Sequence, residues 1–277
     1  MGHVMAQLLY SEFGIRARIG LAGHEPNHAA LINGEIDLYA DYLGTAVRRY
    51  LGLTPPRRAA ATYRTVRDNA RKRWGIEWLP AFGFNNTYAV VMKRTMAETL
   101  GVRTVSDLVP LASALRLGGT ADFLAGNPKV TFAPGGYGAL CAAYGLTFGR
   151  AVDLAADYGA TFEALAADQV DLIVDFPVNP RMVSLDLLEL RDTRHFFAPY
   201  FAAPVVSGQF LAEHPDARAV LERLAGRVDN RRAACMNYAV EMLGQSHASV
   251  AADLAGEISA GVRNAGRARR ANHRPGG

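Results

Sequence analysis

Four aromatic residues of the sequence lie where a ligand site could form. Tyr42, Tyr88, Phe176 and Tyr200 each fall at or just beyond a predicted strand, in turns rich in Gly, Asn or Pro. Open α/β sheets bind their ligands at the ends of strands, whereas a core aromatic usually lies inside an element. The placement indicates a ligand site, and a packing role stays open on placement alone.

Motifs of the common enzyme classes do not accompany these aromatics. The sequence has no phosphate loop of the Gly-x-x-x-x-Gly-Lys type and no Gly-x-Ser-x-Gly turn. Asp37 and Asp41 flank the end of a strand, where carboxylates usually accept hydrogen bonds from the amides of the next helix. His24 and His28 are spaced for one helix face, but Pro26 lies between them. We therefore expect no enzyme, no metal site and no cofactor.

The predicted elements alternate between helix and strand along much of the chain. The helical segments are residues 3–13, 59–74, 161–167, 217–224 and 235–243, and the strands are residues 15–21, 36–39, 76–79, 88–93, 115–118, 170–175 and 201–206. This alternation predicts an α/β protein of two lobes, each a mostly parallel sheet flanked by helices.

Composition and charge narrow the class of protein. With 50% hydrophobic and 20% charged residues in 277, the chain has a globular composition, and its longest apolar stretches are far shorter than the roughly 20 residues of a membrane span. The net charge of +4 comes largely from residues 57–73 and from the tail, residues 263–277. A solvated helix face and a frayed, disordered end account for these charges. We expect no nucleic-acid partner.

Two long motifs resemble one protein family. The run GEIDLYADYLGT at residues 34–45 and the run WLPAFGFNNTYA at residues 78–89 are similar to hallmarks of the glycine betaine/carnitine/choline-binding proteins of ABC importers, in the same order and spacing. Weaker matches continue to about residue 257. The resemblance implies the two-lobed periplasmic-binding-protein fold of type II and a small quaternary-ammonium ligand, such as choline or glycine betaine.

The resemblance also implies an aromatic cage. A quaternary ammonium has no N–H group to donate, so aromatic faces hold it, at about 0.5 to 2 kcal/mol per favourable ring. By position, the cage falls on the four aromatics, and Thr45 matches a position that contacts the polar end of the ligand. The expected ligand-binding residues are Tyr42, Thr45, Asn86, Tyr88, Asp175, Phe176 and Tyr200.

Three departures from the family pattern concern the polar end and the rim of the site. Gly126 stands where family members often carry an arginine that meets a carboxylate, which favours choline over glycine betaine and carnitine. Residues 177–179 replace a common Thr-Asp-Gly, and residues 24–26 replace a Gly-Thr.

The resemblance further implies a domain division and a place of action. We expect residues 1–90 with 201–262 to form lobe I, residues 91–200 to form lobe II, and residues 263–277 to form the tail. The family begins with a strand before the helix that matches residues 2–13, and this sequence lacks that strand and an export signal. We expect both to lie upstream of Met1. The protein would then act outside the cytoplasm, with an ABC permease as its partner, and would meet the membrane only through that permease or an upstream anchor.

Two alternatives remain open at this point. The same fold could serve a receptor for another cationic or amino-acid-like ligand, because Asp41 and Asp175, if they face the cleft, would bond N–H groups directly. An enzyme on a similar two-lobed fold is the second alternative, because a fold does not decide a function.

Overall fold

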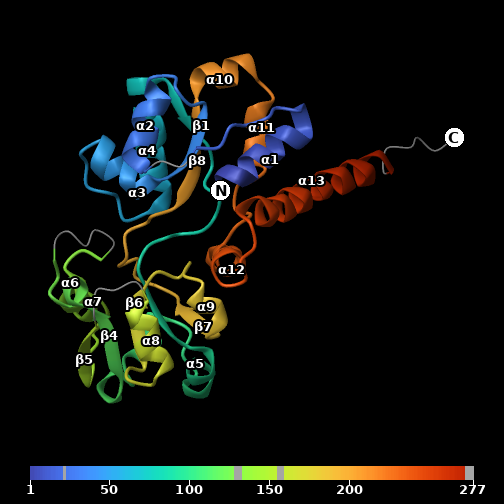
Figure 1. Ribbon diagram of the computed structural model, residues 1–277. Helices are drawn as coiled ribbons and strands as arrows, with labels where there is room; N and C mark the ends of the chain where they lie inside the picture. Colours follow the sequence, from blue (N-terminus) through green and yellow to red (C-terminus); the bar gives the residue numbers. More distant parts are fainter. Residues whose placement is uncertain (21–22, 128–132, 155–158, 272–277) are drawn as a thin grey trace.

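The computed structural model describes residues 1–20, 23–127, 133–154 and 159–271, with backbone alone from 262 to 271. It is an α/β protein with two sheets, which lie in the upper and lower parts of Figure 1. The first sheet contains β1 (Leu38–Tyr42), β2 (Ile76–Trp78) and β8 (Ala202–Ser207). The second contains β3 (Ala89–Lys93), β4 (Arg116–Thr120), β5 (Arg150–Leu154), β6 (Leu172–Asp175) and β7 (Leu187–Leu190).

Helices and helical turns surround both sheets. Those associated with the first part of the chain and with its end are α1 (Gly2–Phe13), α2 (His24–Ile32), α3 (Leu43–Thr45), the π-helical turn η1 (Ala46–Tyr50), α4 (Ala59–Trp74), α10 (Gly208–Glu213), α11 (Ala217–Glu222), α12 (Asn230–Glu241) and α13 (His247–Ala271). Those between β3 and β8 are α5 (Arg94–Leu100), the 3₁₀ turns η2 (Val105–Leu108) and η3 (Ala112–Ala114), α6 (Ala121–Leu124), α7 (Gly136–Tyr144), α8 (Ala160–Ala166) and α9 (Arg181–Ser184). None of the helices in the described ranges combines the length and the apolar character that crossing a membrane requires.

The first sheet corrects the expectation of mostly parallel strands. Its order is β1-β8-β2, and β8 is antiparallel to both neighbours, with Tyr42 opposite Ala202 and Trp78 opposite Val205. The chain enters β8 on its return from the second sheet, so this strand runs against β1 and β2. The strand expected at residues 201–206 is β8, but the pattern of alternating elements did not reveal its antiparallel direction.

The second sheet has the order β5-β4-β6-β3-β7. β4 is parallel to β5 and β6, whereas β3 is antiparallel to β6 and β7. Its central strands are almost entirely apolar and buried, as expected for strands covered on both faces.

Successive residues of β8 enter two different cores, one on each face of the first sheet. Ala202 and Val206 pack in the core that includes α1 and α13, while Ala203 and Val205 pack with Trp78 and α4. This alternation follows from the two-residue period of a strand. Burial on both faces holds β8 in a single register. This register also fixes the position of Tyr200, which lies two residues before the strand.

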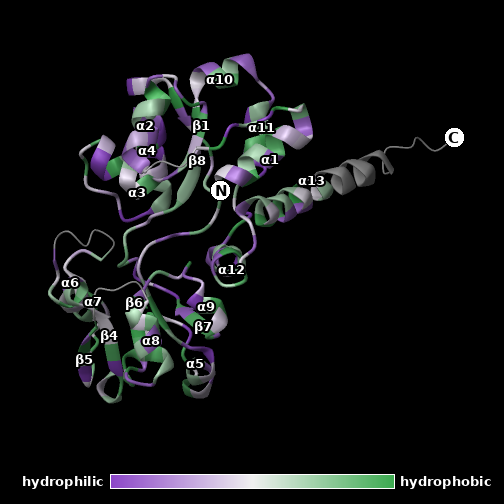
Figure 2. Ribbon diagram, viewed as in Figure 1, coloured by the Kyte–Doolittle hydropathy of each residue, from purple (hydrophilic) through white to green (hydrophobic). Residues whose placement is uncertain are grey.

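The first and last helices of the chain lie side by side. α1 packs along α13, where apolar residues of both helices meet (Figure 2). α13 continues to Ala271, so residues 263–271 are helical and the expectation of a disordered tail from residue 263 was wrong. Alanine and arginine are among the best helix formers, which explains the extension. Residues 272–277 of the expected tail lie outside the described part.

Helix α12 contacts both parts of the molecule. Asn230 donates a hydrogen bond from Nδ2 to Glu189 Oε2 on β7 (2.8 Å), and Asn237 Nδ2 donates to the carbonyl oxygen of Val178 (2.9 Å). Ala234 is buried in a core of the second sheet. The division of the chain into lobe I (residues 1–90 with 201–262) and lobe II (residues 91–200) stays a prediction. Helix α12, which belongs to the expected lobe I, also packs against residues of the expected lobe II. Residues 15–20 form no strand, contrary to the expectation for residues 15–21.

Candidate ligand-binding site

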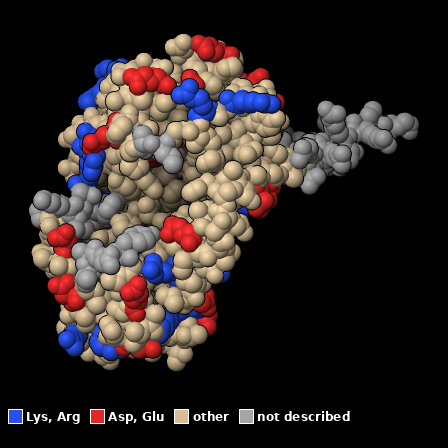
Figure 3. Space-filling view, in the orientation of Figure 1, with Lys and Arg blue, Asp and Glu red and all other residues tan. Residues whose placement is uncertain are grey.

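A cavity of about 510 Å³ lies between the two sheets and α12. Its volume falls within the range of small-molecule sites. The described residues that line it are Met1, His24, Ala40, Tyr42, Phe84, Asn86, Phe176, Val178, Asn179, Ala202, Val228, Ala233, Met236 and Asn237. Figure 3 shows the surface hollowed between the upper and lower parts of the molecule, with walls made mostly of uncharged residues.

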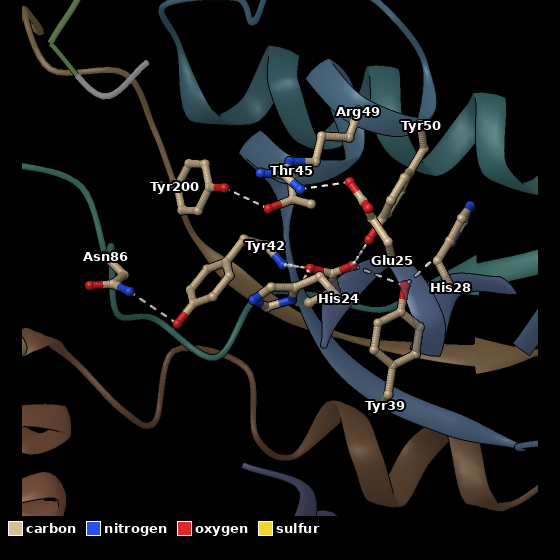
Figure 4. Close-up of polar contacts among 11 residues, drawn as sticks. His24, Glu25, His28, Tyr39, Tyr42, Thr45, Arg49, Tyr50, Asn86 and Tyr200 are labelled. Carbon is tan, nitrogen blue, oxygen red and sulfur yellow. Dashed lines mark hydrogen bonds and ion pairs between the residues drawn. The ribbon is translucent and has the colours of Figure 1, made fainter. Parts of the chain in front are cut away.

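The first aromatic pair consists of Tyr42 and Tyr200. Tyr42 ends β1 and Tyr200 comes two residues before β8, and the register of these strands places the rings in a stack with centroids 5.1 Å apart. The hydroxyl of Tyr200 lies 2.5 Å from Thr45 Oγ1. Thr45 therefore holds one of the expected cage rings in place (Figure 4).

The second aromatic pair consists of Tyr88 and Phe176. Ala89 on β3 pairs with Asp175 on β6, so the residues beside them meet, with ring centroids 4.7 Å apart. Phe123 contacts the Tyr88 ring edge-on at 6.2 Å. Burial raises the pKa of the Tyr88 hydroxyl. One aromatic pair thus belongs to each sheet.

Asn85 and Asn86 lie in the segment that leads from the first sheet to the second, and they are hydrogen-bonded to Tyr200 in the segment that returns. The backbone N–H of Tyr200 donates to Asn85 Oδ1 (2.6 Å), and the backbone N–H of Asn86 donates to the carbonyl oxygen of Tyr200 (3.1 Å). Asn86 Nδ2 donates to the hydroxyl of Tyr42 (3.1 Å), and Oδ1 is buried with no hydrogen-bond partner among the described residues. Asn85 was missed as a site residue, although it lies in the motif at residues 78–89.

Asp175 is directed toward the protein. Its carboxylate accepts hydrogen bonds from Thr161 Oγ1 and from the backbone N–H of Phe176. Burial raises the pKa of this carboxyl group. Of the seven expected ligand-binding residues, Tyr42, Asn86 and Phe176 line the cavity. Thr45, Tyr88, Asp175 and Tyr200 are in contact with those three or with their neighbours.

Asp41 lies beneath the first aromatic pair, with its side chain fully buried. Its carboxylate accepts hydrogen bonds from the hydroxyls of Tyr39 (2.9 Å) and Tyr50 (2.8 Å) and from the backbone N–H of Tyr42 (2.7 Å). His24 Nδ1 lies 2.9 Å from Oδ1 of the same group (Figure 4). The sequence placed Asp41 correctly at the strand end but assigned it to the amides of the next helix. The Tyr42 amide, at the start of α3, agrees with that assignment. The other partners, two tyrosine hydroxyls and His24, were not indicated by the spacing alone.

Residues 24–28 read His-Glu-x-x-His, a spacing found in zinc enzymes. Here the two imidazoles have different partners: His24 contacts Asp41, whereas His28 lies within hydrogen-bonding distance of the Tyr39 hydroxyl and stacks on Tyr50 at 3.7 Å. Figure 4 shows them on opposite sides of the network. In the described ranges, no group of three His, Cys, Asp or Glu side chains is placed to hold a metal.

The tyrosines around Asp41 predict a loss of stability at alkaline pH. Burial and the nearby Asp41 charge raise the pKa of Tyr39 and of Tyr50 above the ordinary value. Above about pH 10, the unfolded chain loses these protons first and becomes relatively more stable. We expect the free energy of unfolding to fall there by up to about 1.4 kcal/mol per pH unit for each phenol. Urea denaturation between pH 8 and 11.5 measures this slope, and Tyr50→Phe should reduce it; an unchanged slope would contradict the assignment.

Comparisons with known proteins agree with this geometry. Residues 1–256 match the sequence profile of the substrate binding domain of ABC-type glycine betaine transport systems. The chain is 31% identical over 255 residues to a glycine-betaine-binding protein of Pseudomonas aeruginosa, covering 90% of this chain and 81% of that protein. It is 25% identical to the carnitine transport binding protein OpuCC of Listeria monocytogenes, over 86% of this chain and 76% of that one.

A solved structure shows the same fold. The apo structure of YehZ from Escherichia coli superposes with a TM-score of 0.82 at 23% identity, covering 92% of each chain. The α/β fold expected from the motifs, that of the type II periplasmic-binding proteins, is therefore confirmed. The profile match and the Pseudomonas relative show that this chain belongs to the family of substrate-binding domains of ABC-type glycine betaine transport systems.

Proposed function

We propose that the chain captures a quaternary-ammonium compound of the choline or glycine betaine type between its two sheets. The observation that carries this proposal is the pair of aromatic rings on each sheet beside one cavity, Tyr42 with Tyr200 and Tyr88 with Phe176. Aromatic faces attract a methylated ammonium without needing a hydrogen-bond donor. Each sheet would supply one wall, and closure of one part on the other would enclose the ligand.

The charges around the cavity favour choline over a zwitterion at neutral pH. Among the described residues that line the cavity, there is no Lys or Arg to meet a carboxylate. Gly126, at the position of the family arginine, has φ +68°, and a Cβ there would lie 2.9 Å from the carbonyl oxygen of Gly135. An arginine at position 126 would be strained, so the local backbone conformation favours glycine there.

The alternative of a receptor for an amine with N–H groups has less support. It required Asp41 and Asp175 to face the cleft, but both carboxylates accept hydrogen bonds from the protein itself. Neither residue lines the cavity. A ligand ammonium would have to displace these bonds, which is costly for buried groups.

The family is one of transport substrate-binding proteins, which are extracytoplasmic and work with a permease. By the same inference, this chain would act on the outer side of the membrane and deliver its ligand to an ABC permease. It would carry no cofactor and perform no catalysis.

Calorimetric titration with choline, glycine betaine, carnitine and arginine at pH 8 tests the proposal. We expect choline to bind most tightly, the two carboxylate-bearing compounds to bind more weakly, and arginine not to bind. Arginine is the matched control, because it is cationic but not methylated. Binding of arginine in preference to choline would support the receptor alternative, and a folded protein that binds none of the four would refute a quaternary-ammonium ligand.

A further inference from the structure

His24 combines three features at the edge of the cavity. It is the first residue of α2, it lines the cavity, and its ring meets that of Tyr42 edge-on with centroids 5.4 Å apart. Its side chain is 48% exposed, whereas that of Asp41, to which it is joined, is 0% exposed. One end of the imidazole is therefore anchored in the protein and the other faces the space beside the first aromatic pair (Figure 4).

Asp41 determines which nitrogen of His24 is available. A carboxylate only accepts hydrogen bonds, so Nδ1, at 2.9 Å from Oδ1, carries its proton. The two tyrosine hydroxyls and the Tyr42 amide hold the carboxylate in place from other directions. No described residue forms a hydrogen bond with His24 Nε2. This nitrogen is an acceptor in the neutral ring and a donor in the protonated ring.

We propose that His24, oriented by Asp41, forms a hydrogen bond through Nε2 with the polar end of the ligand and so selects between ligands. This inference rests on the proposed function. The neutral ring accepts a hydrogen bond from a ligand hydroxyl, as in choline. The protonated ring donates a charge-assisted hydrogen bond to a ligand carboxylate, as in glycine betaine. In its protonated form, His24 thus takes the part of the absent arginine. The preference between the two ligands depends on pH.

The amino group of Met1 also lines the cavity, and burial lowers its pKa. It is present in the wild type and in His24→Gln alike, so comparing the two proteins separates its effect from that of His24. The remaining charged groups near His24 are already paired within the protein. Glu25, next in sequence, is paired with Arg49 at 2.6 Å and both are exposed. Asp41 is buried, and Tyr39 and Tyr50 are hydrogen-bonded to it.

His28 is the other imidazole of α2. It is 7% exposed, lies between Tyr50 and Trp74, and is not among the residues that line the cavity. Within the described chain, His24 is the one imidazole at the cavity.

The test is the ratio of the dissociation constants for choline and glycine betaine, measured by calorimetry at pH 5.5 and 8.5. The ratio cancels any repulsion between a protonated ring and the ammonium group that both ligands share. We expect it to move toward glycine betaine at pH 5.5 by about tenfold or more, the factor expected for one charge-assisted hydrogen bond. His24→Gln should remove this shift, and its thermal melt should match the wild type because the side chain is half exposed.

One control and one spectroscopic measurement complete the test. His247→Gln, at the exposed start of α13, should keep the pH-dependent shift. Nitrogen NMR of the imidazoles at pH 8.5 should show His24 protonated at Nδ1, with its Nε2 signal moving when choline binds. A shift in the ratio that persists in His24→Gln, or one that is absent in the wild type, would overturn the inference. A wild type that binds neither ligand at either pH would instead refute the proposed function.

Discussion

Replacing Gly44 by alanine should weaken binding of the ligand as much as deleting the Tyr200 ring does, while leaving the protein folded. Gly44 lies in α3 directly against the ring of Tyr200, and a Cβ at this position would be 2.0 Å from Cδ2 and 2.2 Å from Cε2 of that ring. The ring must therefore leave its stack on Tyr42 and its contact with Thr45. We expect a loss of affinity for choline of roughly 2- to 30-fold, like that of deleting the Tyr200 ring, because a displaced ring no longer contributes its about 0.5 to 2 kcal/mol. Calorimetry and thermal melting measure the two effects.

Gly138→Ala is the matched control for this substitution. Gly138 lies in α7 and a Cβ there would meet no atom within 4 Å, so binding should be unchanged. In the double variant Gly44→Ala with Tyr200→Ala, the clash is gone, and the substitution of Gly44 should cost less stability than it does in the wild type. Gly44→Ala with the affinity of the wild type would show that Tyr200 is not part of the binding site.

The sequence predicted best those elements whose ends carry their own signals. The helix expected at residues 59–74 is α4, which buries Thr62, Val66 and Ala70 at a four-residue spacing and ends at Gly75 in the left-handed conformation. Glycine suits that position because it has no Cβ, so the sequence itself marks the end of the helix. The strands leading to the aromatic residues were likewise found from their alternating or apolar patterns.

What the sequence did not predict depends on partners far away in the chain. β5 was missed because it is a mostly exposed edge strand with polar residues, which reads as a loop. The antiparallel direction of β8 depends on where the chain returns from. The strand expected at residues 15–21 had a suitable pattern but no neighbouring strand pairs with residues 15–20.

The candidate site shows the same limit. The aromatic residues could be selected from their places at strand ends, but their pairing follows from the β1–β8 and β3–β6 registers. The connection from Asp41 to His24 brings together residues of α2 and β1 whose contact no local pattern specifies. A strand-end carboxylate is found at many turns, and only the structure shows that this one is buried beneath the site.

Removing one ring from each aromatic pair should eliminate measurable binding, whereas removing either alone should not. Tyr88→Ala and Tyr200→Ala each delete one ring, and each loss should weaken choline binding by roughly 2- to 30-fold, from about 0.5 to 2 kcal/mol per ring. In the double variant, both sheets lose a wall and closure no longer encloses the ammonium group. Calorimetric titration of the wild type, the two single variants and the double variant with choline provides the comparison.

The control for this prediction keeps the ring and removes only its hydroxyl. Tyr88→Phe should bind choline almost as the wild type does, because the attraction comes from the ring face, and the neighbouring Phe176 already lacks a hydroxyl. Tyr200→Phe is expected to bind more weakly than the wild type, because it loses the hydroxyl contact with Thr45 that holds the ring. If Tyr88→Ala keeps full affinity while Tyr200→Ala loses it, the ligand is bound by the first sheet alone, and the second pair serves only to pack β3 against β6.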